Sequence, residues 1–190
     1  MGYSILLLST RLSTEVYSSL LALTECTDIV YAQSNKKAVE KVVKNSPASI
    51  FLIPEFSEYS NGPSSVPSQA YRTPQASQKW AFIVHSSGST GLPKPMFQTQ
   101  GACISNYSTS KGYRALLTLP LFHNHGLSTF FRSLFKRKRV AIFNANLPLA
   151  GKNILETLKV AAPESFHSVT YVLKLPSETD EGVNELAKCE

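Results

Sequence analysis

The first fifty residues alternate short apolar runs with segments whose apolar positions recur every three or four residues. The runs at Tyr3–Ser9, Asp28–Ala32 and Ala48–Ile53 predict strands, and the segments between them predict helices capped by Ser13 and Ser34. The apolar faces of these helices are Val16, Leu20, Leu21 and Leu23 in the first, and Ala38, Val39, Val42 and Val43 in the second. This alternation with short joins predicts an α/β fold with a parallel sheet covered by helices.

A polar segment from Glu55 to Lys79 separates this part from the rest of the chain. It is rich in Ser and Pro, so we expect a surface loop or linker. Lys79–Val84 then predicts a strand that runs directly into a Gly/Ser segment. The later patterns predict a weak helix at Ile104–Arg114, a strand at Ala115–Phe122, a helix at Leu127–Phe135, a basic turn and strand at Lys136–Asn144, a helix at Asn153–Ala162, a strand at His167–Leu173 and a terminal helix at Glu178–Glu190.

Composition indicates a globular intracellular chain. A length of 190 residues suits one domain, and a formal charge of +6 suits anionic ligands such as nucleotides. No nucleic-acid-binding motif accompanies the basic residues, so nucleic acid is not an expected partner. The three widely spaced cysteines favour a reducing compartment over a disulfide framework. The apolar run near the N-terminus is too short for a membrane span or signal peptide, so we expect a cytoplasmic protein without membrane contact.

The segment HSSGSTGLPKP has the composition of a phosphate-binding loop. Its glycines permit tight turns, and successive backbone N–H groups in such turns form an anion-binding nest. Hydroxyl side chains add donors, and a lysine adds a positive charge. The candidate phosphate ligands are Ser86, Ser87, Gly88, Ser89, Thr90, Gly91 and Lys94. The spacing differs from the Walker and dinucleotide patterns, so the residues alone leave open both a phosphate loop and an ordinary Ser/Gly turn.

The full string FIVHSSGSTGLPKP, Phe82 to Pro95, resembles the signature loop of the adenylate-forming enzymes. This family includes acyl-CoA ligases, adenylation domains of nonribosomal peptide synthetases (NRPS) and carboxylic acid reductases. LPLFHNHG at Leu119–Gly126 is similar to the next core motif of the family. With Pro95 and the string HSVTYVLKLPSE, the chain looks most similar to the fungal NRPS-like reductases. The resemblance extends from the first predicted strand to the last predicted helix.

The resemblance implies that residues 1–190 form a partial adenylation domain, an incomplete N-terminal subdomain with a mostly parallel sheet and flanking helices. It implies ATP with Mg²⁺ as cofactor, a carboxylic acid as substrate and a role in secondary-metabolite biosynthesis. The segment from Ser86 to Gly91, with Lys94, would hold the phosphates while the carboxylate attacks the α-phosphorus. His123 would contact the adenylate or the acid pocket. No residue is assigned a catalytic or metal-binding role.

Several motifs of the family have no counterpart before Glu190. These are the aromatic and acidic motif for adenine and Mg²⁺, the ribose-binding aspartate and the C-terminal domain with its catalytic lysine; carrier and reductase domains are also missing. Gln100, in QTQG, departs from the THG expected there. We therefore expect a truncated module that is inactive alone. The alternatives are half of a split enzyme, completed by another polypeptide, and a non-catalytic nucleotide-binding or docking module.

Other residues have a structural interpretation beside a functional one. His85 is either part of the loop chemistry or a hydrogen-bonded strand end. His123 and His125 would share a face of a strand, but a metal site there has no third ligand close by. His167 is interpreted as a strand-entry residue, and the KRKR run as cations at a helix C-terminus rather than a nuclear or nucleic-acid signal. The helical spacing of the following aromatic residues favours core over pocket wall: Phe122, Phe130, Phe131 and Phe135.

Overall fold

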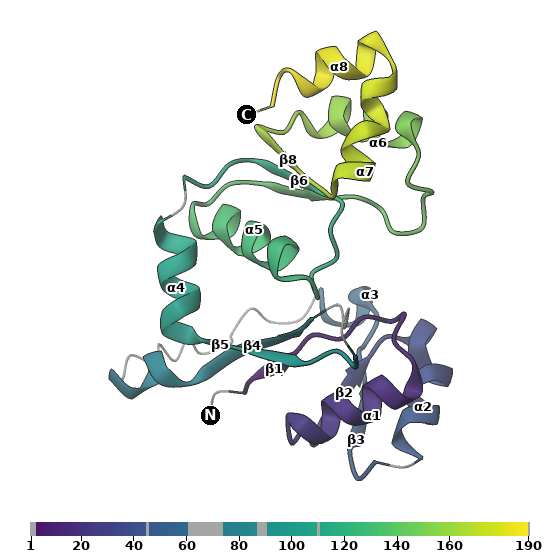
Figure 1. Cartoon of the computed structure of the whole chain (residues 1–190), viewed down its shortest axis with the longest axis vertical. Helices are drawn as coiled ribbons and strands as arrows, with labels where there is room; N and C mark the ends of the chain where they lie inside the picture. Colours follow the sequence, from purple (N-terminus) through teal and green to yellow (C-terminus); the bar gives the residue numbers. More distant parts are fainter. Residues whose placement is uncertain (1–2, 45, 61–73, 87–90, 110, 190) are drawn as a thin grey trace. The chain divides into compact units, whose positions relative to one another are not determined.

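The computed structural model describes residues 3–44, 46–60, 74–86, 91–109 and 111–189. The chain forms two compact units, Met1–Gln100 and Gly101–Glu190, and each is described by itself (Figure 1). Short strands alternate with helices along both units, and most of the strand pairs are parallel, which confirms the predicted α/β class.

The first unit begins with the predicted order of elements. β1 (Ile5–Leu6) leads to α1 (Thr14–Leu23), β2 (Asp28–Tyr31) to α2 (Lys36–Val43), and β3 (Ser49–Leu52) follows. β2 and β3 pair in parallel along their whole length. α1 starts where predicted, because Ser13 Oγ accepts a hydrogen bond from the backbone N–H of Val16 and satisfies one of the unpaired donors of the first turn.

The second helix departs from the prediction at its start. Ser34 lies inside a short 3₁₀ turn, Gln33–Asn35, and Asn35 is the N-cap, with no side-chain capping bond. Two residues of the predicted apolar stripes are wrong. Leu23 ends α1 with 57% of its surface exposed, and Ala38 is exposed on α2. Val42 is the buried residue of α2, where the helix lies against α1.

The sheet of β2 and β3 exposes much of its apolar surface. All four residues of β3 are exposed. The exposed large apolar side chains of this sheet and its edge are Val30, Ile50, Phe51, Leu52 and Ile53. Because successive residues of a strand point to opposite faces, these apolar side chains are exposed on both faces of the sheet.

A β-hairpin occupies the end of the first unit. β4 (Trp80–His85) pairs in parallel with β1 on one side and antiparallel with β5 (Pro95–Thr99) on the other. The strand β5 was not predicted from the sequence. It is an edge strand in the order β1-β4-β5, a position that tolerates the missing N–H of Pro95. The polar segment 55–79 contains α3 (Phe56–Tyr59) and the 3₁₀ turn η2 (Pro74–Gln78).

The second unit is built on a parallel sheet in the order β7-β6-β8. Figure 1 shows β6 and β8 running side by side. The strands are β6 (Ala115–Leu117), β7 (Val140–Ile142) and β8 (Ser165–His167), and the helices between and around them are α4 (Gln100–Thr109), α5 (Asn124–Phe135) and α6 (Gly151–Ala161). The buried cluster of this unit comprises Leu116, Phe143, Ile154, Leu158 and Val172.

The prediction of a strand at His167–Leu173 is wrong. His167 ends β8, and α7 (Thr170–Lys174) follows after a two-residue turn. The residues of α7 have strand propensity, but the backbone N–H of Leu173 donates to the Val169 carbonyl (3.1 Å) in a helical turn, and Val172 packs against the buried cluster. The terminal helix is confirmed as α8 (Asp180–Leu186), after the turn η3 (Pro176–Glu178).

The aromatic residues of α5 are less buried than predicted. Phe130 and Phe131 are half-buried, and Phe135 is 52% exposed. The buried face of the helix is made of smaller residues: Gly126, Leu127, Ser128, Thr129 and Ser133. Small residues on this face let the helix approach β6 closely, which is why the larger rings lie at its margin. In the described part of the chain, no helix has the length and apolar character required to cross a membrane.

Candidate phosphate loop and histidine pair

The predicted phosphate loop connects the two strands of the β4–β5 hairpin. Its base is closed by two hydrogen bonds: the Ser86 N–H donates to the Lys94 carbonyl (3.0 Å), and the Lys94 N–H donates to Ser86 Oγ (2.9 Å). Ser87, Gly88, Ser89 and Thr90 lie outside the described residues. Ser86 and Lys94 are therefore held side by side at the base of the loop.

Gly91 and Lys94 have the backbone and charge that the loop prediction requires. Gly91 has φ +147°, which side-chain-bearing residues rarely adopt, while a Cβ there would meet no atom within 4 Å. The glycine is thus required by its backbone conformation and not by lack of space. Lys94 is exposed at the end of the loop, immediately before β5. Its role in binding phosphate stays a prediction.

His85 has a structural role at the base of the loop. It is buried, with 8% of its surface exposed. Its Nε2 accepts a hydrogen bond from the Ser9 N–H (3.3 Å), and its Nδ1 lies 3.1 Å from the Ser86 carbonyl. The neutral tautomer with a proton on Nδ1 satisfies both contacts at once. His85 thereby ties the segment after β1 to the start of the loop, as expected for a hydrogen-bonded strand end.

A second group of polar residues lies at the carboxyl edge of the sheet in the second unit. β6 ends before Thr118 and β8 before Ser168, and the hydroxyl groups of these two residues are hydrogen-bonded to each other. Ligands of parallel α/β sheets usually bind outside this edge. His123 is the N-cap of α5, with an exposed side chain whose ring centroid lies 4.7 Å from that of Phe122. A contact of His123 with an adenylate stays a prediction.

His125 and His167 form a pair that the sequence did not predict. His125 Nε2 lies 3.2 Å from His167 Nδ1, and His167 Nε2 lies 3.1 Å from Ser165 Oγ. Both contacts are hydrogen bonds if His125 Nε2–H donates to His167 Nδ1 and His167 Nε2–H donates to Ser165 Oγ. The predicted pairing of His123 with His125 on a strand is wrong, because both residues belong to the start of α5. Among the described residues, no group of three or more metal-binding side chains was found.

The environment of this pair disfavours a second proton. Burial lowers the pKa of His167 below its ordinary value of 6.5, and the charges of His125 and Arg132 lower it further. Arg132 is hydrogen-bonded to the amide oxygen of Asn106, a neutral partner, and no ion pair to Arg132 is seen within the described residues. The neutral form of His167 is therefore favoured in the folded protein.

We expect the second unit to lose stability as the pH falls through about 6.5, the ordinary pKa of histidine, toward the lowered pKa of His167. The pKa of His167 is lowered on folding, so the unfolded chain binds more protons below pH 6.5 and acid favours unfolding. Urea unfolding followed by amide exchange in the second unit measures this dependence. In His167→Gln the dependence should weaken, and an unchanged slope in this variant would contradict the assignment.

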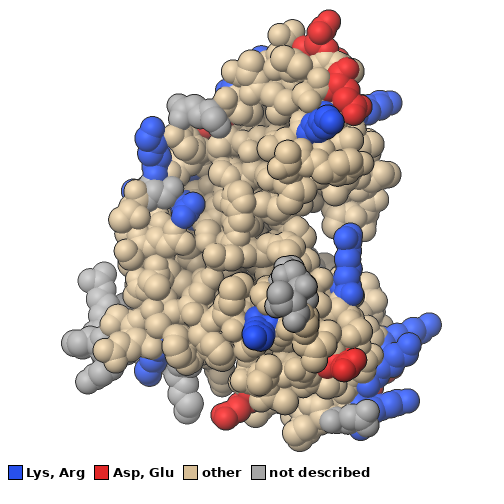
Figure 2. Space-filling view, in the orientation of Figure 1, with Lys and Arg blue, Asp and Glu red and all other residues tan. Residues whose placement is uncertain are grey.

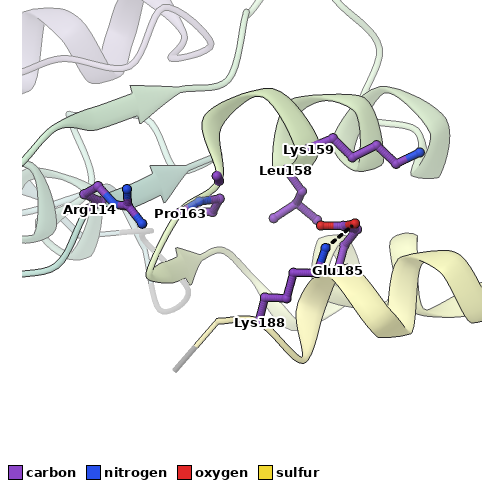
Figure 3. Close-up of a pocket in the computed structure, with 7 residues that line it drawn as sticks. Arg114, Leu158, Lys159, Pro163, Glu185 and Lys188 are labelled. Carbon is purple, nitrogen blue, oxygen red and sulfur yellow. Dashed lines mark hydrogen bonds and ion pairs between the residues drawn. The ribbon is translucent and has the colours of Figure 1, made fainter.

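A cavity of about 290 Å³ lies elsewhere in the second unit (Figure 3). It is bordered by Arg114 and by Lys188, whose ammonium group pairs with Glu185 (2.7 Å). Arg114 pairs with Glu164 (3.6 Å). The pKa of the Glu164 carboxyl group is lowered, mainly by the hydrogen bond from the backbone N–H of Arg114 and less by the charges of Lys138 and Arg114. The cavity thus lies at the amino ends of β6 and β8, with its cations already paired, and we do not assign it as the functional site.

The family is established by comparison with known proteins. The sequence pattern of the AMP-binding enzyme family matches residues 1–185, so the chain belongs to this family. The chain is 32% identical over 102 residues to a carboxylic acid reductase of Neurospora crassa, covering 53% of this chain and 10% of that protein. It is 26% identical over 200 residues to an adenylate-forming reductase of Stachybotrys bisbyi, covering 98% of this chain and 19% of that protein.

A solved structure shows the same fold. The O-succinylbenzoate coenzyme A synthetase of Bacillus subtilis, in complex with ATP and a magnesium ion, superimposes with a TM-score of 0.72 at 22% identity. The match covers 92% of this chain and 36% of that one. The predicted resemblance to adenylate-forming enzymes is thus confirmed for family and fold, and the chain spans a small part of the curated relatives it matches.

Proposed function

We propose that the loop between β4 and β5 binds the phosphate groups of ATP, as one part of a site that activates a carboxylic acid as its adenylate. The observation that carries this proposal is the pair of hydrogen bonds between Ser86 and Lys94, which closes the loop at its base. Membership in the AMP-binding family and the similarity to fungal reductases support an acid-activating role in a reductase.

The described residues suit the binding of phosphate oxygens. Ser86 Oγ accepts from the Lys94 N–H, and the hydroxyl can still donate its own proton toward the loop. The Lys94 side chain is exposed at the same place and can neutralise phosphate charge. Bound ATP would supply the reactive α-phosphorus and the pyrophosphate leaving group. The loop residues would bind and orient the phosphate groups of ATP. Positioning and charge stabilisation of this kind are the main protein contribution to phosphoryl and nucleotidyl transfer.

Magnesium is not assigned to residues of this chain. Mg²⁺ is usually held by carboxylates together with phosphate oxygens. The described residues include no cluster of three or more His, Cys, Asp or Glu side chains that could hold a metal ion. The residues that would hold Mg²⁺ are therefore not assigned.

His123, the exposed N-cap of α5, is proposed to contact the acid or the adenylate.

Binding of ATP tests the phosphate-loop assignment. We expect Lys94→Ala to weaken ATP binding by about tenfold, because one charge-assisted hydrogen bond to phosphate is lost. Isothermal titration of the 190-residue chain measures the affinity. Lys79→Ala is the matched control, since Lys79 is also exposed in the first unit and the charge change is equal. Equal affinities of Lys94→Ala and wild type would refute the assignment.

We further propose that these 190 residues do not complete the reaction by themselves. Carboxylate-dependent exchange of pyrophosphate into ATP should therefore stay at background. Exchange by the purified chain would refute this statement while leaving the loop assignment intact. Exchange that appears only after addition of a polypeptide with the other family motifs would indicate a split enzyme.

A further inference from the structure

A second candidate site lies in the first unit, outside the predicted phosphate ligands. It is a cavity of about 390 Å³ that is open to solvent, and its lysine, threonine and serine residues are exposed. Its walls come from the segment after β1, the start of α1, the connection after β2 and one side of α2. The lining residues are Thr10, Leu12, Thr14, Tyr17, Ser34, Lys37, Ala38, Lys41 and Val42.

The topology of the unit explains why these residues meet. The chain leaves the carboxyl end of β1 through Thr10 and enters α1 at Thr14. It leaves the carboxyl end of β2 through the turn that contains Ser34 and enters α2. β1 and β2 belong to separate sheets, and the connections that follow them both contribute residues to the cavity lining. The cavity is thus built from segments that follow two different strands.

The cavity carries positive charge without a neutralising partner in its lining. Lys37 and Lys41 lie one turn apart on α2, so both ammonium groups project from the same side of the helix. No Asp or Glu lines the cavity, and the described residues show no ion pair to either lysine. Two like charges in this arrangement repel each other, and a bound anion would relieve the repulsion.

The lack of ion pairs to its lysines, within the described residues, distinguishes this cavity from the cavity in the second unit. There, Lys188 and Arg114 each pair with a carboxylate. Figure 2 shows blue Lys and Arg side chains gathered over the part of the first unit where Figure 1 places α2. The two lysines of the cavity are flanked by Lys36, the first residue of α2, and Lys44, its C-cap.

The remaining polar groups of the cavity are hydrogen-bond donors. Thr10, Thr14 and Ser34 contribute hydroxyl groups, and no hydrogen bond of these side chains is seen within the described residues. Tyr17 acts as part of the wall, because its hydroxyl already donates to the Ser9 carbonyl (2.6 Å) and burial raises its pKa. Hydroxyl donors and compact ammonium groups suit a tetrahedral phosphate, whereas a planar carboxylate is better matched by the arginine fork.

We propose that this cavity binds a phosphate group, held between Lys37 and Lys41 on one side and the hydroxyls of Thr10, Thr14 and Ser34 on the other. The site goes beyond the proposed function, since it uses none of the residues assigned to ATP. It lies near the loop, because Ser9, next to Thr10, is hydrogen-bonded to His85, next to Ser86 (3.3 Å). The phosphate therefore belongs either to a separate phosphorylated ligand or to the nucleotide held by the loop.

Titration with inorganic phosphate and pyrophosphate tests the site. In the full chain, followed by amide NMR, both probes should shift the signals of Thr10, Thr14 and Ser34. We expect the double variant Lys37→Ala/Lys41→Ala to weaken binding by at least about tenfold, because two charged donors are removed. The matched control is Lys36→Ala/Lys44→Ala, which removes the same charge from the first residue and the C-cap of α2 and should keep most of the affinity. Equal losses in the two double variants, or no loss in the first, would overturn the proposal.

The same titrations identify the source of the phosphate. If phosphate still binds in the presence of saturating ATP, and in Lys94→Ala, the site takes a separate phosphorylated ligand. If ATP displaces phosphate and Lys37→Ala/Lys41→Ala weakens ATP binding, the site holds part of the nucleotide. A chain that fails to bind ATP but binds phosphate through Lys37 and Lys41 would refute the proposed function and leave this site standing.

Discussion

Replacing Gly182 by alanine should strongly destabilise the second unit. A Cβ at Gly182 would lie 1.8 Å from the carbonyl oxygen of Pro176 and 2.7 Å from its carbon. Both obstacles are backbone atoms of η3, which cannot move aside as a flexible side chain would. Alanine favours the helix by about 1 kcal/mol over glycine. The collision should outweigh this gain and cost about 3 kcal/mol net.

Thermal unfolding of the full chain, with amide exchange to assign the transition to each unit, measures this effect. For a unit of this size, about 3 kcal/mol corresponds to a fall in Tm of more than about 10 °C. Asn184→Ala is the control, because Asn184 is exposed on the same helix and its replacement leaves stability nearly unchanged. A Gly182→Ala variant as stable as Asn184→Ala would show that η3 and the start of α8 are not in close contact.

The sequence predicted helices with a continuous apolar stripe and failed where local propensity conflicts with packing. α6 was predicted because its apolar residues recur with helical spacing, and Ile154 and Leu158 are indeed buried. The residues of α7 were predicted as a strand because Val and Tyr favour strands. Their conformation is decided by Val172, which reaches a buried cluster assembled from β6, α6 and the loop after β7. Such a cluster cannot be read from the segment alone.

The candidate sites were predictable where their residues are close in the sequence and not where the fold brings distant residues together. The loop ligands were predicted because they lie within one short segment, from Ser86 to Gly91 together with Lys94. The pairing of His125 with His167 depends on the alignment of β8 beside β6, which no local pattern specifies. Likewise, Lys37 and Lys41 form a cavity wall only when the connection after β1 meets α2. Spacing along the chain therefore suggested the loop, whose role in binding phosphate stays a prediction, but neither of the other groups.

Replacing Gly126 by alanine should disturb both the stability of the second unit and its histidine pair. A Cβ at this buried position would lie 2.6 Å from the Pro120 carbonyl oxygen and 3.0 Å from that of Leu119. The first turn of α5 must then move away from the Leu119–Pro120 segment. We expect the free energy of unfolding to fall by about 2 kcal/mol, after allowance for the better helix propensity of alanine.

The same displacement should separate His125 from His167, whose facing nitrogens lie 3.2 Å apart. Since the charge of His125 contributes to the lowered pKa of His167, this pKa should move back toward its ordinary value in Gly126→Ala. Titration of the histidine ring signals by NMR measures this change. Leu134→Ala, at a position of α5 that is 47% exposed, should alter neither stability nor titration appreciably. If Gly126→Ala lowers stability but leaves the titration of His167 unchanged, the pair is held by β8 rather than by the first turn of α5.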